Sequence, residues 1–404
     1  MARWSGRRRP TGTGGGCRPR GSETARPESP VPVPHPERRK RARLLGAVLA
    51  ALGLALFPVV KYGNVFPDTG KPMAFGRPLA GHRQAAFRTA STLADGTRIG
   101  VTTLHGKKSG FTGKVWAWAP PEYYQERYRD SAFPVLIALP GGRGYPSNYW
   151  NRPRLGLQRA VTDLAALGRS KPFLLVMPQL NPDPRHYYDG SDIPGRPKIG
   201  SWLSDDVPDL VRATFRTFTS RDGWALMGSS SGGFVGLKMA LQHPDRFRAV
   251  IASGPDTRPD SPLWRGHEKE RRANDPGRLA AHLSARPGAP PVYLQFQIGT
   301  EERGRADLER FIRRYAKGPV TAALHVIQGG GHNAKGYVRG MREASLEAIG
   351  KVLRGPAPEV RPDRTYTAGP GAEGPYGVSS STFTSAGKPV VGPTRRANSV
   401  TPRS

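Results

Sequence analysis

The stretch Gly228-Ser229-Ser230-Ser231-Gly232-Gly233 is the feature of this 404-residue chain that best predicts its fold and chemistry. It follows an apolar run at 223–227 that is typical of a buried strand, and it precedes a helix-like run at 234–242. The pattern Gly-x-Ser-x-Gly between a strand and a helix is a nucleophile elbow, a sharp turn that exposes a serine hydroxyl above a sheet. We therefore expect Ser230 to be a nucleophile that a neighbouring base must activate.

Segments with strand and helix patterns alternate on both sides of this turn. Residues 98–104 and 113–119 alternate in polarity as antiparallel strands do. Unbroken apolar runs, typical of strands buried on both faces of a parallel sheet, lie at 134–139, 172–177, 223–227, 249–252, 292–296 and 322–327. Apolar residues recur at helical spacing within 207–218, 308–315 and 341–353. The alternation predicts an α/β domain over residues 86–354, with a mostly parallel central sheet flanked by helices.

Two positions downstream of Ser230 complete a candidate catalytic triad. His332 follows three glycines directly after the last predicted strand, where a flexible loop allows its imidazole to reach the turn. Glu301 and Glu302 follow the preceding strand; we favour Glu302 as the acid and keep Glu301 as the alternative. The acid would fix the histidine tautomer and stabilise the imidazolium without itself taking the proton.

An oxyanion hole requires two backbone N–H groups directed at the developing charge. We expect one from Ser231, and the other from Gly142 or Arg143 in the glycine-rich loop after the strand at 134–139. The guanidinium of Arg143 is also suited to an anionic part of a substrate. Tryptophans are further candidates for lining a substrate pocket, with simple packing in the core as the alternative; they are Trp150, Trp202 and Trp264.

Five pieces of the sequence resemble the esterase family of α/β-hydrolases, which includes esterase D, feruloyl esterases and the antigen 85 mycolyltransferases. They are Pro134-Val-Leu-Ile-Ala-Leu-Pro-Gly-Gly142, Ser201-Trp-Leu-Ser-Asp-Asp-Val-Pro208, the turn at 228–233, His243-Pro-Asp-Arg-Phe247 and Gly330-Gly-His-Asn333. Arg143 after two glycines, with Trp150 downstream, resembles the antigen 85 branch in particular. The resemblance covers residues 86–354. It implies an α/β-hydrolase fold and an ester hydrolase or acyltransferase that needs no metal or organic cofactor.

The N-terminal part of the chain predicts one transmembrane helix. Residues 1–43 are expected to be a basic, disordered leader. Its basic block at 37–43 precedes an uncharged run that we assign to a span at 44–61. Cations flanking a span stay cytoplasmic, which places the catalytic domain outside the cell membrane. A cleaved signal peptide, giving a secreted protein, is the alternative. Residues 62–85 are expected to be a linker, and 355–404 a disordered tail.

The net charge of +31 at pH 7 predicts attraction to anionic lipid or wall polymers, unless it only reflects arginine-rich codon usage. No nucleic-acid-binding motif is present, so we expect no nucleic-acid partner. Cys17 is the single cysteine, which excludes an intramolecular disulfide, and no metal-ligand spacing occurs.

Together these features predict a membrane-anchored, extracellular serine ester hydrolase that forms an acyl-enzyme. The first alternative is an acyltransferase acting on envelope lipid or glycan, since both reactions share the first half. The second is a non-catalytic cationic protein that binds the cell wall.

Overall fold

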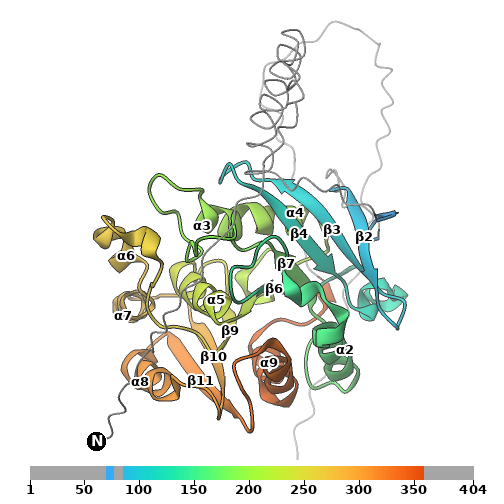
Figure 1. The fold of residues 1–404 in the computed structure, drawn as a ribbon. Coiled ribbons are helices and arrows are strands. Elements are labelled where there is room, and N and C mark those ends of the chain that lie inside the picture. The colour runs from blue at the N-terminus through green and yellow to red at the C-terminus, as the bar shows by residue number, and fades with distance from the viewer. Residues whose placement is uncertain (1–69, 77–84, 359–404) are drawn as a thin grey trace, which may run out of the picture. The chain divides into compact units, whose positions relative to one another are not determined.

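The computed structural model describes residues 70–76 and 85–358, which are built around a ten-stranded sheet (Figure 1). Its strands lie in the order β1-β2-β3-β4-β7-β6-β8-β9-β10-β11. The bounds are β1 Pro72–Met73, β2 Phe87–Thr92, β3 Arg98–His105, β4 Thr112–Trp118, β6 Val135–Leu139, β7 Leu174–Pro178, β8 Trp224–Ser229, β9 Ala249–Ser253, β10 Val292–Gly299 and β11 Val320–Ile327.

From β7 to β11 every pair of neighbouring strands is parallel, whereas β1 to β4 are antiparallel and β4 pairs antiparallel with β7. Every residue of β6, β7, β8 and β9 is buried, as the unbroken apolar runs require for strands covered on both faces. The prediction of a mostly parallel central sheet is confirmed.

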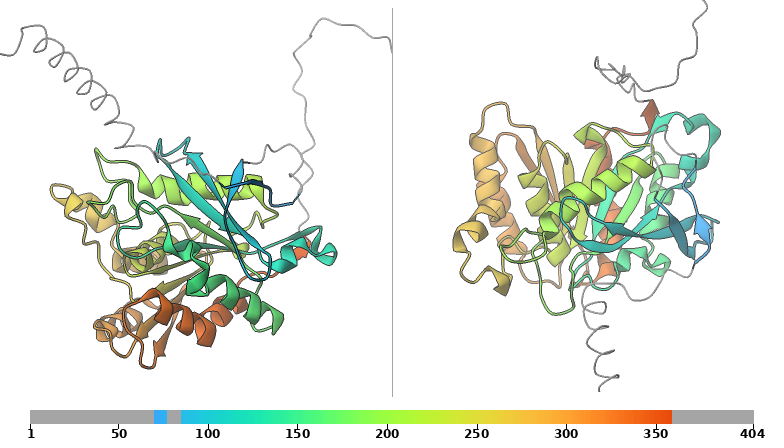
Figure 2. Two further views of the ribbon diagram at one scale, coloured as in Figure 1. Left: turned by 45° about the vertical axis from the view of Figure 1, so that its right-hand side comes forward. Right: turned by 90° about the horizontal axis from the view of Figure 1, so that it is seen from above.

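Helices cover both faces of this sheet (Figure 2). Alternate residues of the strands belong to two separate cores. One core joins Val135, Ile137 and Leu139 to α4, α5, α7 and α8; the other joins Leu136 and Ala138 to α2, α9 and α10. The helices are α2 Leu157–Ala166, α3 Ile199–Ser201, α4 Val207–Thr214, α5 Ser231–Gln242, α6 Glu268–Ala273, α7 Pro276–Ala285, α8 Arg305–Tyr315, α9 Ala334–Gly340 and α10 Leu346–Val352.

The apolar spacing at 207–218 extended the predicted helix too far. Helix α4 ends at Thr214, and the extended backbone of Phe215 turns its ring against Phe75, at 4.7 Å between centroids. Phe215 therefore fits the helical spacing of apolar residues but packs in the core from beyond the end of the helix.

Ordered strands also lie inside two segments that the sequence predicted to be linker and tail. Strand β1 pairs with β2, because Phe75 beside it is fully buried in the core, and β12 (Ala357–Pro358) pairs with β5 (Ser131–Ala132). The predicted span at 44–61, the leader and most of the tail lie outside the described residues. Within residues 70–76 and 85–358, no helix combines the length and apolar composition needed to cross a membrane.

A buried lysine ties the loop at 187–192 to α5, the helix that follows Ser230. Lys238 is fully buried, and its Nζ donates to the carbonyl oxygens of Asp189 (2.6 Å) and Gly190 (2.8 Å) and to Oγ of Ser191. These bonds hold Asp189 in a left-handed backbone conformation, with φ of 49°. Burial lowers the pKa of Lys238 from 10.5 to about 8.

This lowered pKa predicts a pH-dependent stability. Between pH 8 and 10.5 the unfolded chain binds more protons at Lys238 than the folded chain does. The contribution of Lys238 to the free energy of unfolding therefore increases as the pH rises. We expect Lys238→Met to lose that gain, about 3 kcal/mol in total at 1.4 kcal/mol per pKa unit. Denaturant unfolding at pH 7.5 and 10 measures it, with the exposed Lys351→Met as control. Equal pH dependence in both variants would contradict the prediction.

Candidate active site

Ser230 occupies the turn between β8 and α5 with a backbone that non-glycine residues rarely adopt, φ 54° and ψ −126°. Its N–H donates to the carbonyl oxygen of Ser253 at the end of β9, at 2.8 Å. Two glycines allow the turn to close: a Cβ on Gly228 would lie 2.2 Å from the oxygen of Gly232, and one on Gly232 would lie 2.4 Å from the oxygen of Pro140. The geometry is the strained strand-to-helix turn that the sequence predicted.

His332 and Glu302 are in direct contact, which distinguishes between the two candidate acids. Nδ1 of His332 lies 2.6 Å from Oε2 of Glu302, and Oε1 of the same carboxylate accepts from the N–H of Gly299 at 2.7 Å. The Glu302 side chain is 2% exposed and that of His332 is 53% exposed. Glu301 is exposed. The structure therefore brings Glu302, and not Glu301, to the imidazole.

Tyr337 is a member of this cluster that the sequence analysis missed. Its hydroxyl donates to Oε2 of Glu302 at 2.5 Å and lies 2.8 Å from Nδ1 of His332. Burial and the neighbouring carboxylate hold the pKa of Tyr337 far above its ordinary value, so the phenol remains a hydrogen-bond donor. Tyr337 lies on α9, five residues after His332, and no sequence motif marks it. The only signal in the sequence is that it lies close after the loop that carries the histidine.

The candidate oxyanion loop is held against the turn by hydrogen bonds. Oγ of Ser231 donates to the carbonyl oxygen of Gly142 at 2.8 Å, and the N–H of Gly141 donates to the hydroxyl of Tyr149 at 2.6 Å. That hydroxyl also contacts Oγ of Ser229, which makes Tyr149 a second residue that the sequence analysis missed. In the described part of the chain the N–H groups of Gly142, Arg143 and Ser231 donate to no protein acceptor, so all three predicted donors are available.

The three predicted pocket tryptophans belong to the packed interior instead, which corrects that expectation. Each indole is buried and its N–H is satisfied. Trp150 donates to the oxygen of Leu139 (2.9 Å), Trp202 to that of Gln179 (3.1 Å) and Trp264 to Oδ2 of Asp189 (2.7 Å). Large aromatic side chains stabilise a core when their polar atom finds a partner, and these do.

Arg143 differs from the tryptophans because it is exposed. Its guanidinium lies over the ring of Tyr187, with Cζ 4.4 Å from the centroid.

No group of three or more His, Cys, Asp or Glu side chains suited to a metal ion occurs within residues 70–76 and 85–358.

The fold and this arrangement of residues define an α/β-hydrolase. The profile of the family described as "Putative esterase" matches residues 114–338, more than half of the chain. The chain therefore belongs to this family of carboxylic ester hydrolases, as the resemblance implied.

Solved structures of esterases share the fold. A ferulic acid esterase superposes with a TM-score of 0.53 at 17% identity, covering 64% of this chain and 99% of that one. An S-formylglutathione hydrolase from Agrobacterium tumefaciens superposes with a TM-score of 0.52 at 18% identity, covering 66% and 99%. At these identities the likeness concerns the fold alone, and it confirms the predicted α/β-hydrolase architecture.

Two curated proteins match parts of the sequence. An S-formylglutathione hydrolase of Paracoccus denitrificans is 30% identical over 80 residues, 19% of this chain and 28% of that protein. An uncharacterised protein of Corynebacterium glutamicum is 25% identical over 159 residues, 37% of this chain and 34% of the relative. The chain thus spans about a third of the length of the curated relatives it matches.

Gly254 offers a test of the cluster that does not depend on turnover. A Cβ at this residue, whose φ is 49°, would lie 2.2 Å from the Tyr337 hydroxyl, 2.7 Å from Oε2 of Glu302 and 3.1 Å from Nδ1 of His332. We expect Gly254→Ala to separate the carboxylate from the imidazole and so remove the low-field proton resonance of the hydrogen-bonded Nδ1–H in NMR spectra.

Gly288→Ala is the matched control. Gly288 also has a positive φ, of 67°, but a Cβ there meets nothing within 4 Å. A low-field resonance that persists unchanged in Gly254→Ala would show that the three side chains are not packed as described.

Proposed function

We propose that this α/β-hydrolase cleaves carboxylic esters through a Ser-Glu-His triad and an acyl-enzyme intermediate. The observation that carries the proposal is the buried Glu302 carboxylate against Nδ1 of His332, on the same edge of the sheet as the strained Ser230 turn. Membership of the esterase family supports it, and the two S-formylglutathione hydrolases and the ferulic acid esterase are hydrolases of thioesters or esters by name.

In this mechanism His332 acts through Nε2, because Nδ1–H is engaged by Glu302. Nε2 removes the proton from the Ser230 hydroxyl as Oγ attacks the ester carbonyl, and then returns it to the departing alkoxide. In the second half, Nε2 takes a proton from water as the water oxygen attacks the acyl-enzyme carbonyl, and returns it to Oγ of Ser230 as the carboxylic acid leaves. Glu302, held by Tyr337 and the N–H of Gly299, keeps the tautomer and stabilises the imidazolium without taking its proton.

The developing oxyanion would be bound by the N–H of Ser231 together with that of Gly142 or Arg143. The hydrogen bond from Ser231 Oγ to the carbonyl of Gly142 supports this pairing, because it fixes the loop to the start of α5 before substrate arrives. Donors fixed in advance need no reorganisation during the reaction, which is the source of their catalytic effect.

Substitution of the proposed triad tests this mechanism. Ser230→Ala and His332→Ala should lower kcat/KM on 4-nitrophenyl esters by three orders of magnitude or more, as removal of either member does in serine hydrolases. Ser230→Ala should also abolish labelling by a fluorophosphonate, whereas Ser284→Ala should not. We expect Glu302→Gln to lose more activity than Glu301→Gln.

Retention of labelling in Ser230→Ala would exclude this nucleophile, and the reverse ranking of the glutamates would move the acid to Glu301. Assays with an added acceptor alcohol separate hydrolysis from acyl transfer. Folding of each variant is verified by circular dichroism.

We propose further that the enzyme works outside the cytoplasmic membrane, anchored by residues 44–61. The support is in the sequence: an uncharged run with a basic cluster on its N-terminal side. Residues 1–43 would hold +9 of the chain's +31 on the cytoplasmic side, so residues 44–404 carry +22. That charge favours anionic headgroups or wall polymers as surroundings, and envelope lipid or glycan esters as substrates.

Protease treatment of intact cells tests this location. Added protease should digest the catalytic domain, and the membrane fraction should retain the full-length chain. A soluble extracellular form that begins after residue 55 would show cleavage instead of anchoring. A protease-resistant cytosolic form would contradict the proposed location altogether.

A further inference from the structure

Arg143 extends from a loop whose backbone is fixed on both sides of the residue. The carbonyl oxygen of Gly142 accepts from Ser231 Oγ at 2.8 Å, and that of Arg143 accepts from Nδ2 of Asn181 at 2.5 Å. Ser231 directly follows the proposed nucleophile. The side chain of Arg143 therefore starts from a defined position beside the site, although the residue itself is exposed.

The guanidinium is fixed as well, because it lies over the ring of Tyr187 at 4.4 Å from the centroid. The carbonyl oxygen of Tyr187 accepts from Oγ of Ser261 at 2.5 Å. The next residue, Tyr188, is buried, and its N–H donates to Oδ1 of the same Asn181 at 2.9 Å. Asn181 thus connects the loop of Arg143 to the segment that supports its ring partner.

Among the described residues, no acidic side chain forms an ion pair with this cation. In the part of the chain that the structure describes, the guanidinium of Arg143 forms no ion pair and donates no hydrogen bond. Asp183, four residues before Tyr187 in the sequence, has its carboxylate engaged by the Tyr188 hydroxyl at 2.7 Å and by His186. Stacking occupies only the flat face of a guanidinium, so its in-plane N–H donors stay available for the two oxygens of a carboxylate.

We propose that Arg143, supported by Tyr187, binds a carboxylate carried by the substrate, so that the enzyme selects anionic esters over neutral esters of the same size. The proposal rests on the proposed function, since Arg143 belongs to the loop that would hold the oxyanion. A neutral ester leaves the guanidinium in water, where it is solvated at no cost, and such an ester is therefore hydrolysed without being preferred.

The test compares two matched pairs of substrates. The 4-nitrophenyl monoester of adipic acid against 4-nitrophenyl hexanoate places the charge on the acyl side; 4-acetoxybenzoate against its methyl ester places it on the alcohol side. We expect the wild-type enzyme to favour the anionic member of at least one pair by ten-fold or more in kcat/KM, and the preference to fall as salt is added.

Variants then assign this preference to the stacked arginine. Arg143→Gln keeps the backbone N–H, so its effect on the oxyanion cancels in the ratio between anionic and neutral esters, and that ratio should fall to about one. Arg143→Lys keeps a charge without the planar donors and should retain only part of the ratio. Tyr187→Leu should lower the ratio, whereas Tyr187→Phe, which keeps the ring, should not.

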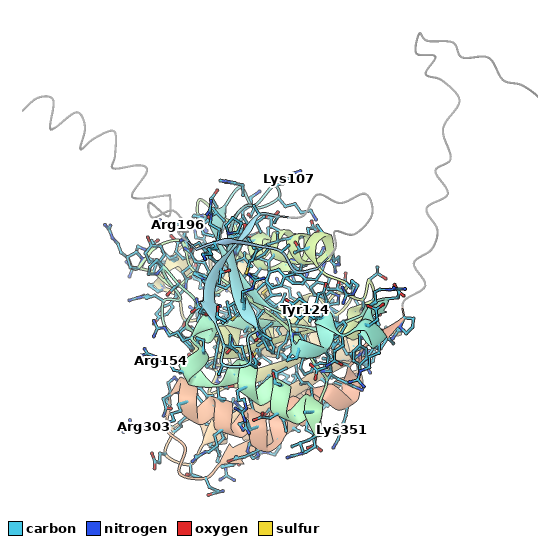
Figure 3. The ribbon with its side chains drawn as sticks, turned by 90° about the vertical axis from the view of Figure 1, so that its right-hand side faces the viewer. Lys107, Tyr124, Arg154, Arg196, Arg303 and Lys351 are labelled. Atoms are coloured by element: carbon cyan, nitrogen blue, oxygen red, sulfur yellow. The ribbon has the colours of Figure 1, made fainter. Side chains whose placement is uncertain are left out.

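Lys351→Gln serves as the control for net charge. Lys351 is one of the exposed cations at the periphery of the domain (Figure 3). Its Nζ pairs with Glu347 at 2.9 Å. It lines a surface hollow beside Tyr293 at the start of β10, at the edge of the sheet opposite the carboxyl ends of the strands. The ratio of kcat/KM between anionic and neutral esters should be the same in Lys351→Gln as in the wild type.

Two results overturn the inference while leaving ester hydrolysis in place: a wild-type ratio near one in both pairs, or a preference that survives Arg143→Gln. A second measurement requires no turnover. Calorimetry on Ser230→Ala should show the anionic member of at least one pair binding at least ten-fold more tightly than its neutral partner, and Arg143→Gln added to it should remove that difference. Equal binding of the anionic and neutral members in both pairs to Ser230→Ala would reject the subsite even if no ester were hydrolysed.

Discussion

The close approach of three backbone segments at the Ser230 turn is the constraint on which the rest of this molecule depends. Strand β8, the start of α5 and the loop at Pro140 meet where a Cβ on Gly228 or Gly232 would lie less than 2.5 Å from a carbonyl oxygen. Ser230 itself holds a left-handed φ, a conformation that costs about 1–3 kcal/mol in a non-glycine residue. Strands β8 and β9, which are buried along their whole length, supply the packing that keeps the turn in place.

Parallel pairing then determines which side chains can meet at that turn. Neighbouring strands β8, β9, β10 and β11 run in the same direction, so their carboxyl ends lie along one edge of the sheet. Ser230 follows β8, Gly254 follows β9, Glu302 follows β10 and His332 follows β11. The strand between the serine and the acid contributes a glycine because any side chain there would occupy the space of the Glu302 carboxylate.

A second group of contacts builds the side of the site that carries Arg143. Asn181 bonds to the arginine loop, and Lys238 holds the segment after Tyr187 against α5 through three donated hydrogen bonds. The loop of Arg143 and the segment at 187–192 are therefore tied, through Asn181 and Lys238, to the helix that follows Ser230. A chain with a net charge of +31 attracts anions from a distance, but selection among them requires a cation held in place, as Tyr187 holds Arg143.

The amino-acid sequence by itself determined the features that depend on local pattern. Apolar runs marked the buried parallel strands, and Gly-x-Ser-x-Gly between strand and helix marked Ser230, since both signals arise from neighbours along the chain. The glycines before His332 marked its loop for the same reason. The leader, the proposed membrane span and most of the tail were expected on composition and lie outside the described residues.

Only the tertiary structure decided which side chains contact one another, because that depends on the directions in which the loops run and on the distances between them. Glu301 and Glu302 are adjacent and chemically alike, and only the path of the chain after β10 turns Glu302 toward His332. Tyr337 and Tyr149 follow no motif, because a phenol becomes part of such a site only when folding brings its hydroxyl within hydrogen-bond distance. The tryptophans show the converse: an indole suits a substrate pocket and a core equally well in sequence, and only the neighbours that bury Trp150, Trp202 and Trp264 assign them to the core.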